Sequence, residues 1–230
     1  MSDRSSIFDM IGPVMIGPSS SHTAGVVRIG RVARRLHDKQ PERATITFYN
    51  SFARTYEGHG SNRAIMAGLL DFGTDDERIR TALDLAQEAG IEFKFKAVTN
   101  ASALHPNTVR VKLSSGPEGE EEKVDVVGVS RGGGLISIVE LDGFRCNFTA
   151  QRHTLVVQAD DVKGSIAFVA NMLANDDCNI ATMTVDRRAR NQKARLVFEM
   201  DSEITDLTVQ YMESRNWIDR VVYLPNIQIQ

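Results

Sequence analysis

Residues 154–185 read TLVVQADDVKGSIAFVANMLANDDCNIATMTV, and this stretch decides the fold of the C-terminal part of the chain. Its opening run, Thr154–Gln158, is rich in β-branched residues and predicts a strand. The apolar residues of Gly164–Ala174 then recur at helical spacing, and Ile180–Asp186 returns to the alternation of a strand. The stretch therefore predicts a strand, a helix and a second strand in succession.

The same alternation continues toward the C-terminus. We expect a strand at Ala194–Met200 after the polar turn RRARNQ, a helix at Ile204–Ser214 and a last strand at Ile218–Leu224. The order βαββαβ is that of the ferredoxin-like plait, in which two helices cover one face of an antiparallel sheet. Residues 153–230 are therefore expected to form a ferredoxin-like domain.

Two short segments of this domain carry a more specific resemblance. The segments DVKG at 161–164 and NIA at 179–181 resemble the ACT regulatory domain. The resemblance implies that two copies pair, and that an amino-acid effector binds near Asp161, Gly164 and Asn179. The family usually has proline where Lys163 stands, so this loop is expected to be less rigid. A loop and two caps are the alternative interpretation of these residues.

Residues 1–148 mix helical and strand patterns, and they predict a separate domain. Helices are expected at Ala24–His37, Ser61–Phe72 and Asp76–Ala89, with Ser61 as an N-cap. The expected strands are Ala44–Tyr49, Ile91–Val98, Thr108–Ser114, Val124–Val129 and Leu135–Leu141, and the acidic run 118–122 reads as a hairpin turn. The fold class of the whole chain is thus α+β, with its two domains joined near residues 143–153.

The stretch GPSSSHTAG, residues 17–25, gathers hydroxyls and an imidazole in front of an expected helix. Unpaired amides and the positive end of the helix dipole favour a small anion there, such as a carboxylate or phosphate. A serine before a helix is also an ordinary N-cap. One cap needs one hydroxyl, however, and this stretch offers Ser20, Ser21 and Thr23 besides Ser19, together with His22.

A second polar loop, GHGSN at 58–62, has a similar character. His59 stands between two glycines, which have no side chains to bury it, so it is not expected to be a core residue. Ser61 and Asn62 add a hydroxyl and an amide at the start of another expected helix. If the two loops converge, they form one pocket with two histidines. Such histidines can donate or accept protons near neutral pH, or hold a carboxylate when charged.

Composition excludes several classes of function. The net charge of −3 and the pI near 6.0 argue against a nucleic-acid partner, and no apolar run is long enough for a membrane span. The N-terminal residues do not read as a signal peptide, so we expect a cytoplasmic protein. The two cysteines, Cys146 and Cys178, are too few for an iron–sulfur cluster of the chain's own, and no metal site is expected.

Taken together, four segments resemble the β subunit of the iron–sulfur-dependent bacterial L-serine dehydratase, a lyase of amino-acid catabolism. They are GPSSSHTAGVVRIGR, SFARTYEGHGSNRAIMAGLLDF, HPNTV and SRGGG, followed by the ACT-like unit. The resemblance implies conversion of L-serine to pyruvate and ammonium, a step that feeds gluconeogenesis. It also implies an oxygen-sensitive 4Fe-4S cluster, which acts as a Lewis acid on the substrate hydroxyl and is held by a cysteine-bearing α subunit rather than by this chain.

The resemblance also implies that residues 1–148 form an allosteric substrate-binding-like domain, and it suggests roles for single residues. His59 is the first choice for a proton-handling residue and His22 for a carboxylate or hydroxyl contact, while the group that abstracts the α-proton stays open. The substrate-orienting candidates are Ser20, Ser21, Thr23, Ser61 and Asn62. Asn62 stands where the family more often has Asp, and Arg131 stands where a small or aliphatic residue is usual.

Two other interpretations are kept. The chain could be a free-standing amino-acid sensor, which would bind serine alone and recruit no cluster-bearing subunit. It could also be a regulatory and oligomerisation appendage of a biosynthetic dehydrogenase. No dinucleotide-binding glycine fingerprint is present, so a dehydrogenase would need a partner chain. The effector, any monovalent cation and the exact oligomeric state are not specified by these patterns.

Overall fold

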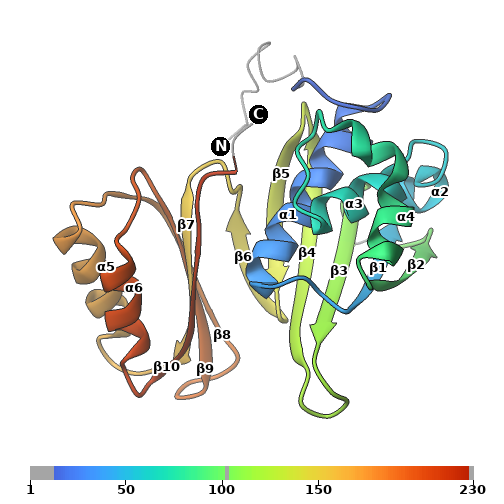
Figure 1. Ribbon diagram of the computed structural model, residues 1–230. Helices are drawn as coiled ribbons and strands as arrows, with labels where there is room; N and C mark the ends of the chain where they lie inside the picture. The colour runs from blue at the N-terminus through green and yellow to red at the C-terminus, as the bar shows by residue number, and fades with distance from the viewer. Residues whose placement is uncertain (1–12, 102–103, 228–230) are drawn as a thin grey trace. The chain divides into compact units, whose positions relative to one another are not determined.

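The computed structural model of the chain describes residues 13–101 and 104–227 (Figure 1). The described residues form two compact units, of which the first ends at Asp142 and the second begins at Gly143. Both units combine helices with largely antiparallel sheet, as the α+β expectation requires. In the described part of the chain, no helix is both long and apolar enough to cross a membrane.

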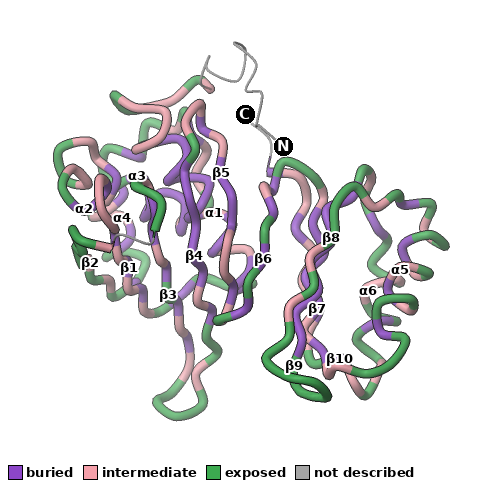
Figure 2. Tube along the Cα trace, turned by 180° about the vertical axis from the view of Figure 1, so that it is seen from behind, coloured by how far each residue is buried: buried purple, intermediate pink, exposed green. Residues whose placement is uncertain are grey.

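The first unit is built on a sheet whose strands lie in the order β2-β1-β3-β4-β5. Strand β1 runs parallel to β2, and the other neighbouring pairs are antiparallel. The strands are β1 (Arg43–Tyr49), β2 (Glu92–Val98), β3 (Thr108–Ser115), β4 (Glu122–Gly132) and β5 (Leu135–Leu141). Strand β4 is buried over most of its length (Figure 2), because helix α1 (Gly25–His37) packs on it.

Helices α1 and α3 (Ser61–Leu69) lie against each other on this sheet (Figure 1). Their contact depends on two glycines: a Cβ atom at Gly68 would lie 2.2 Å from the carbonyl oxygen of Val27, and one at Gly30 would lie 2.6 Å from that of Ile65. Only the absence of a side chain allows such a close approach of two backbones. The approach also brings together the segments that precede the two helices.

The remaining helical elements of this unit correct several sequence expectations. The elements are α2 (Asn50–Thr55), a 3₁₀ turn at Glu77–Thr81 and α4 (Ala82–Glu88). The expected helix Asp76–Ala89 is therefore divided, since Asp76 caps the 3₁₀ turn by accepting a hydrogen bond from the Arg78 amide. The expected helix Ser61–Phe72 stops at Leu69. Helix α2 had not been expected at all.

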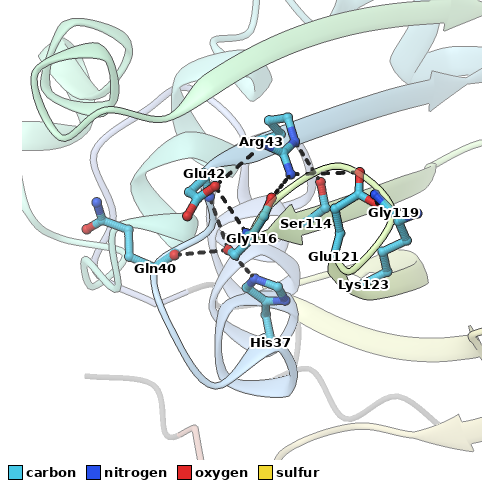
Figure 3. A network of polar contacts seen from close by, with 10 residues as sticks. His37, Gln40, Glu42, Arg43, Ser114, Gly116, Gly119, Glu121 and Lys123 are labelled. Atoms are coloured by element: carbon cyan, nitrogen blue, oxygen red, sulfur yellow. Dashed lines mark hydrogen bonds and ion pairs between the residues drawn. The ribbon is translucent and has the colours of Figure 1, made fainter.

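The C-terminal end of α1 is fixed by a network of polar contacts (Figure 3). The buried His37 places its Nε2 atom 2.8 Å from Ser115 Oγ on β3. The same hydroxyl accepts from the Glu42 amide at 3.3 Å and donates to the Gln40 carbonyl at 3.4 Å. Arg43 Nη2 donates to the Gly116 carbonyl at 2.8 Å. These bonds tie the helix end to the start of β1 and the end of β3.

The second unit shows the expected order of strands and helices. After β6 (Phe144–Phe148), its elements are β7 (His153–Asp160), α5 (Ser165–Asn175), β8 (Ile180–Arg187), β9 (Lys193–Met200), α6 (Asp206–Glu213) and β10 (Ile218–Leu224). The last four strands form an antiparallel sheet in the order β10-β7-β9-β8. Val169 and Leu173 of α5 and Met212 of α6 are buried in one cluster with alternate residues of β7 and β9, so both helices cover the same face. Strand β6 had not been expected.

Candidate functional site

The hydroxyl-rich stretch before α1 is not a loop, as the sequence suggested, but a helical turn. Residues Ser20–Ala24 form a π-helical turn that runs directly into α1. Ser19 caps it: its Oγ accepts from the His22 amide at 3.3 Å, and its carbonyl accepts from the Thr23 amide at 2.8 Å. Two of the amides that were expected to face an anion are therefore already bonded. The side chains, rather than these amides, define the chemistry here.

The second polar loop turns at Gly60, whose φ of 71° is the left-handed conformation that glycine adopts readily. Gly60, not Ser61, occupies the N-cap position, so the expected cap at Ser61 is wrong. The Ser61 and Asn62 amides donate to the Tyr56 carbonyl at 2.7 and 3.4 Å. These two amides at the start of α3 are therefore bonded within the turn and do not face a ligand.

Ser61 instead joins the two polar segments. Its Oγ donates a hydrogen bond of 2.9 Å to the His22 carbonyl, across 39 positions of sequence, and its side chain is fully buried. The rings of His22 and His59 lie 4.7 Å apart between centroids, tilted by 33°. Phe52 meets the His22 ring edge-on at 4.8 Å. The convergence of the two histidine segments, which the sequence left conditional, is confirmed.

Only one of the two ring nitrogens of His22 has hydrogen-bond partners among the described residues. Its Nδ1 lies 3.2 Å from Ser19 Oγ and 3.1 Å from Ser21 Oγ, whereas its Nε2 is buried and has no hydrogen-bond partner. Burial lowers the pKa of His22 from its ordinary value, and the positive charge available to the neighbouring His59 lowers it further. The ring therefore favours the neutral state, and one of its two nitrogens is buried without a partner among the described residues.

A cavity of about 480 Å³ opens beside these histidines. His59 and Thr23 line it, together with the backbone of the Gly17 region. The Thr23 hydroxyl is buried and makes no hydrogen bond. Gly17 has a φ of 145°, and a Cβ atom there would lie 2.4 Å from Thr23 Oγ1, so glycine is needed for the chain to pass this hydroxyl.

Not all the predicted residues reach this cavity. Of the predicted residues, only Thr23 and His59 line it, so the expected pocket with two histidines has one histidine in its lining. The residues outside the lining are Ser20, Ser21, His22, Ser61 and Asn62. The Asn62 Oδ1 accepts a hydrogen bond from the Arg63 amide of its own helix. Sequence reasoning missed three charged residues of the lining, Glu57, Arg63 and Arg80. The first two flank the GHGSN loop and could have been noticed there, whereas nothing in the sequence near Arg80 connects it with the histidines.

The HPNTV and SRGGG segments meet away from this cavity. The Ser130 amide donates to the Asn107 carbonyl at 3.0 Å, and Arg28 of α1 donates to the Gly134 carbonyl. Burial and, to a smaller extent, the nearby Arg31 together lower the pKa of Arg28 to about 10. These contacts fix the turn between β4 and β5 to α1, and none of these residues lines the cavity.

In the second unit, the effector candidates are engaged with neighbouring protein groups. Asp161 accepts from Arg187 Nη1 at 2.7 Å and from the Asn191 amide at 3.1 Å, and these hydrogen bonds lower its pKa. Asn179 Nδ2 donates to Asp201 at 2.8 Å. Gly164 has a φ of 85° and is the N-cap of α5. Gly164 is thus a helix cap, whereas Asp161 and Asn179 bond to neighbouring loop and strand residues and cap no described helix.

The residues present do not fit an iron–sulfur cluster. Cys146 and Cys178 are both buried and form no disulfide, and the Cys178 thiol donates to the Ser202 carbonyl at 3.4 Å. Across residues 13–101 and 104–227, no group of three or more His, Cys, Asp or Glu side chains is placed to hold a metal ion. A cluster of this kind takes about four thiolates.

The fold and site define an α+β protein whose first unit has a cavity lined by His59, which is in ring contact with His22. Comparisons with known proteins extend this description. The family model for the serine dehydratase beta chain matches residues 6–140. The probable L-serine dehydratase beta chain of Bacillus subtilis is 46% identical over 222 residues, which cover 96% of this chain and 94% of that protein. The L-serine dehydratase beta chain of Peptoniphilus asaccharolyticus is 35% identical over 201 residues, covering 87% and 89%. The chain therefore belongs to the serine dehydratase beta-chain family.

A third relative belongs to a different class of enzyme. The D-3-phosphoglycerate dehydrogenase of Bacillus subtilis is 26% identical over 173 residues, which cover 75% of this chain but only 32% of that protein. The likeness thus extends over a part of the dehydrogenase.

Proposed function

We propose that this chain is the β subunit of an L-serine dehydratase and that it turns over L-serine only together with a separate α subunit. Membership of the family supports the reaction class, and the names of its relatives support a partner chain. The observation that carries the proposal is the buried, unpartnered Nε2 of His22 beside His59. Buried polar atoms of a purely structural site are almost always paired.

The chemistry of the reaction gives these residues definite tasks. L-serine loses its α-proton and its β-hydroxyl as water, and the resulting enamine becomes an imine whose hydrolysis releases ammonium and pyruvate. In this proposal His59, which lines the cavity, handles a proton, and His22 makes a hydrogen bond to a polar group of the substrate through Nε2. Ser21 and Ser61 act through His22 by holding its ring and its backbone.

The proposal assigns the 4Fe-4S cluster to the α subunit. The two buried cysteines of this chain and the lack of a suitable ligand group in its described part support that assignment. This chain then contributes the imidazoles, the Thr23 hydroxyl and the shape of the cavity to a site that the partner completes.

The second unit is proposed to be an ACT-like, ferredoxin-like regulatory domain that pairs with a second copy. Its strand order β10-β7-β9-β8 supports this, because β8 is an edge strand. Two apolar side chains of β8 are exposed, Met183 at 48% and Val185 at 39%. Exposed apolar side chains on an edge strand favour pairing with another chain, which would cover them.

The test is anaerobic pyruvate formation from L-serine by this chain alone, by its cysteine-bearing partner alone and by the two co-purified after cluster reconstitution. The proposal predicts activity only with both chains. Full activity of the partner alone, or no activity of a complex with an intact cluster, would contradict it.

The likeness to part of a phosphoglycerate dehydrogenase favours a second candidate, in which the chain is a regulatory appendage of a biosynthetic enzyme. An appendage would bind a small anion without turnover, and so would a free-standing serine sensor. Both alternatives predict ligand binding by this chain and no dependence of pyruvate formation on it.

A further inference from the structure

Three charged side chains share the cavity with His59 and Thr23. Arg63 lies in the first turn of α3, Arg80 comes from the 3₁₀ turn Glu77–Thr81, and Glu57 precedes the GHGSN loop. All three are largely exposed, so their charges stay solvated until a ligand arrives. The three come from separate segments of the first unit, and the fold of that unit alone brings them to one cavity.

The guanidinium groups of Arg63 and Arg80 are not paired with other side chains. In the described part of the chain, neither guanidinium forms a hydrogen bond or an ion pair. Most other arginines of this unit are paired; Arg78, for example, contacts Asp76 at 2.5 Å, and Arg110 contacts Asp125 at 2.6 Å. Arginines left unpaired around a cavity are suited to bind a carboxylate, because the planar guanidinium matches its two oxygens.

The carboxylate of Glu57 favours an amino acid over a simple anion as the ligand of this cavity. Its carboxylate accepts one hydrogen bond, from Tyr56 Oη at 2.9 Å, and keeps further acceptor capacity. A negative charge in the same cavity opposes binding of phosphate or of a plain carboxylate. A zwitterion, in contrast, uses both signs of charge at once.

The buried Thr23 hydroxyl supplies a third, neutral contact. It is 2% exposed, lines the cavity and has no hydrogen-bond partner. Leaving such a hydroxyl unpaired costs free energy that a ligand hydroxyl can recover. The cavity of about 480 Å³ also falls in the size range of small-molecule sites.

We infer that this cavity binds the α-amino acid as a zwitterion, with its carboxylate on Arg63 and Arg80, its ammonium on Glu57 and its side-chain hydroxyl at Thr23. The inference rests on the proposed function, which supplies L-serine as the amino acid. It adds the residues of this chain that fix the orientation of the substrate beside His59.

The test is calorimetric titration of the full 230-residue chain with L-serine and three probes. 3-Hydroxypropionate lacks the ammonium, ethanolamine lacks the carboxylate, and inorganic phosphate represents a simple anion. We expect L-serine to bind tightest of the four. Absence of saturable L-serine binding, or tighter binding of phosphate, would overturn the inference.

Substitutions test the positive and the negative charges of the cavity separately. Arg63→Gln and Arg80→Gln should each weaken L-serine and 3-hydroxypropionate by about ten- to a hundredfold, since each removes charged hydrogen bonds. Glu57→Gln should weaken L-serine but leave 3-hydroxypropionate unchanged or tighter. Arg54→Gln is the matched control, because Arg54 is an exposed arginine of α2 outside the cavity lining, and it should bind L-serine like the unaltered chain.

The same variants in the assembled complex distinguish this inference from the proposed function. If the complex makes pyruvate while Arg63→Gln and Arg80→Gln keep both their L-serine affinity and their KM, the inference fails and the proposed function stands. If the complex makes no pyruvate but the titrations behave as expected, the proposed function fails and the amino-acid site stands.

Discussion

Helix α1 has a buried or half-buried histidine at each end, and the two are held in opposite ways. At the C-terminal end, His37 is 1% exposed and bonded to Ser115 within the network of Figure 3. At the N-terminal end, His22 has hydroxyls at Nδ1 and nothing at Nε2. One histidine belongs to the scaffold, and the other keeps a free atom beside a cavity.

Burial alone therefore does not distinguish a structural histidine from a functional one. The free energy of folding favours pairing of every buried polar atom, so an unpaired atom is a cost that folding alone does not explain. Two such atoms, His22 Nε2 and Thr23 Oγ1, lie at the N-terminal end of α1, and Arg35 Nε lies near the C-terminal end. Only at the N-terminal end do the unpaired atoms lie beside His59 and its cavity, so we interpret that end as the functional one.

The largest expected effect is on turnover at the N-terminal end. His59→Asn in the complex should lower kcat for pyruvate formation by at least about 100-fold, because general acid–base catalysis contributes at least that much. Co-purification with the α subunit and cluster content should be unchanged. A fully active His59→Asn complex would remove the proton-handling role.

The next effect is on stability at the C-terminal end. His37→Ala leaves Ser115 Oγ without its closest partner and should lower the free energy of unfolding by about 1–3 kcal/mol in urea denaturation. The kcat of the assembled complex should stay within about twofold of the unaltered one, since the His37 ring is bonded to Ser115 at the end of α1 away from His59. Loss of turnover at unchanged stability would reverse the assignment of the two ends.

Thr23→Val sharpens the comparison, because it removes an unpaired buried hydroxyl at nearly constant volume. It should raise the free energy of unfolding by about 1 kcal/mol and weaken L-serine binding by about five- to tenfold. Thr23→Ser retains the hydroxyl and is the control. If Thr23→Val destabilises the chain and leaves L-serine binding unchanged, the hydroxyl is structural.

The smallest effect is on the pH dependence of stability. The pKa of His22 is lowered in the folded state from 6.5, so the unfolded chain binds more protons as the pH falls below about 6.5. The free energy of unfolding should therefore decrease between pH 6.5 and the lower folded pKa, and His22→Gln should reduce this decrease. The pKa of His105 is also lowered, by burial and then by Arg131, so the measurement needs an His105→Gln background. An identical slope with and without His22 would contradict this account.

Periodicity predicted most of the fold, because most helices and strands bury one face and repeat accordingly. It did not predict α2, which is six residues long and begins at Asn50 with a φ of 51°. It also did not predict that the expected helix Asp76–Ala89 begins with a 3₁₀ turn, which Asp76 caps. Both failures come from local backbone conformation that apolar spacing does not encode.

Sequence patterns predicted the two histidines of the candidate site but not its charged residues. His22 and His59 stand in unusual local sequence, so they could be selected before their convergence was known. The Ser61 bond to the His22 carbonyl spans 39 positions, and Arg80 reaches the cavity from a separate turn. Such long-range contacts depend on the approach of α1 and α3 at Gly30 and Gly68, which only the structure reveals.

The most direct test of the central claim makes the same substitution at both ends of α1. His22→Gln and His37→Gln chains are each assembled with the α subunit, and anaerobic pyruvate formation is measured per intact cluster. We expect His22→Gln to lose at least about tenfold in kcat, because it removes the proposed hydrogen bond from Nε2 to the substrate, while His37→Gln retains its activity. Equal activity of the two complexes, or a larger loss for His37→Gln, would contradict it.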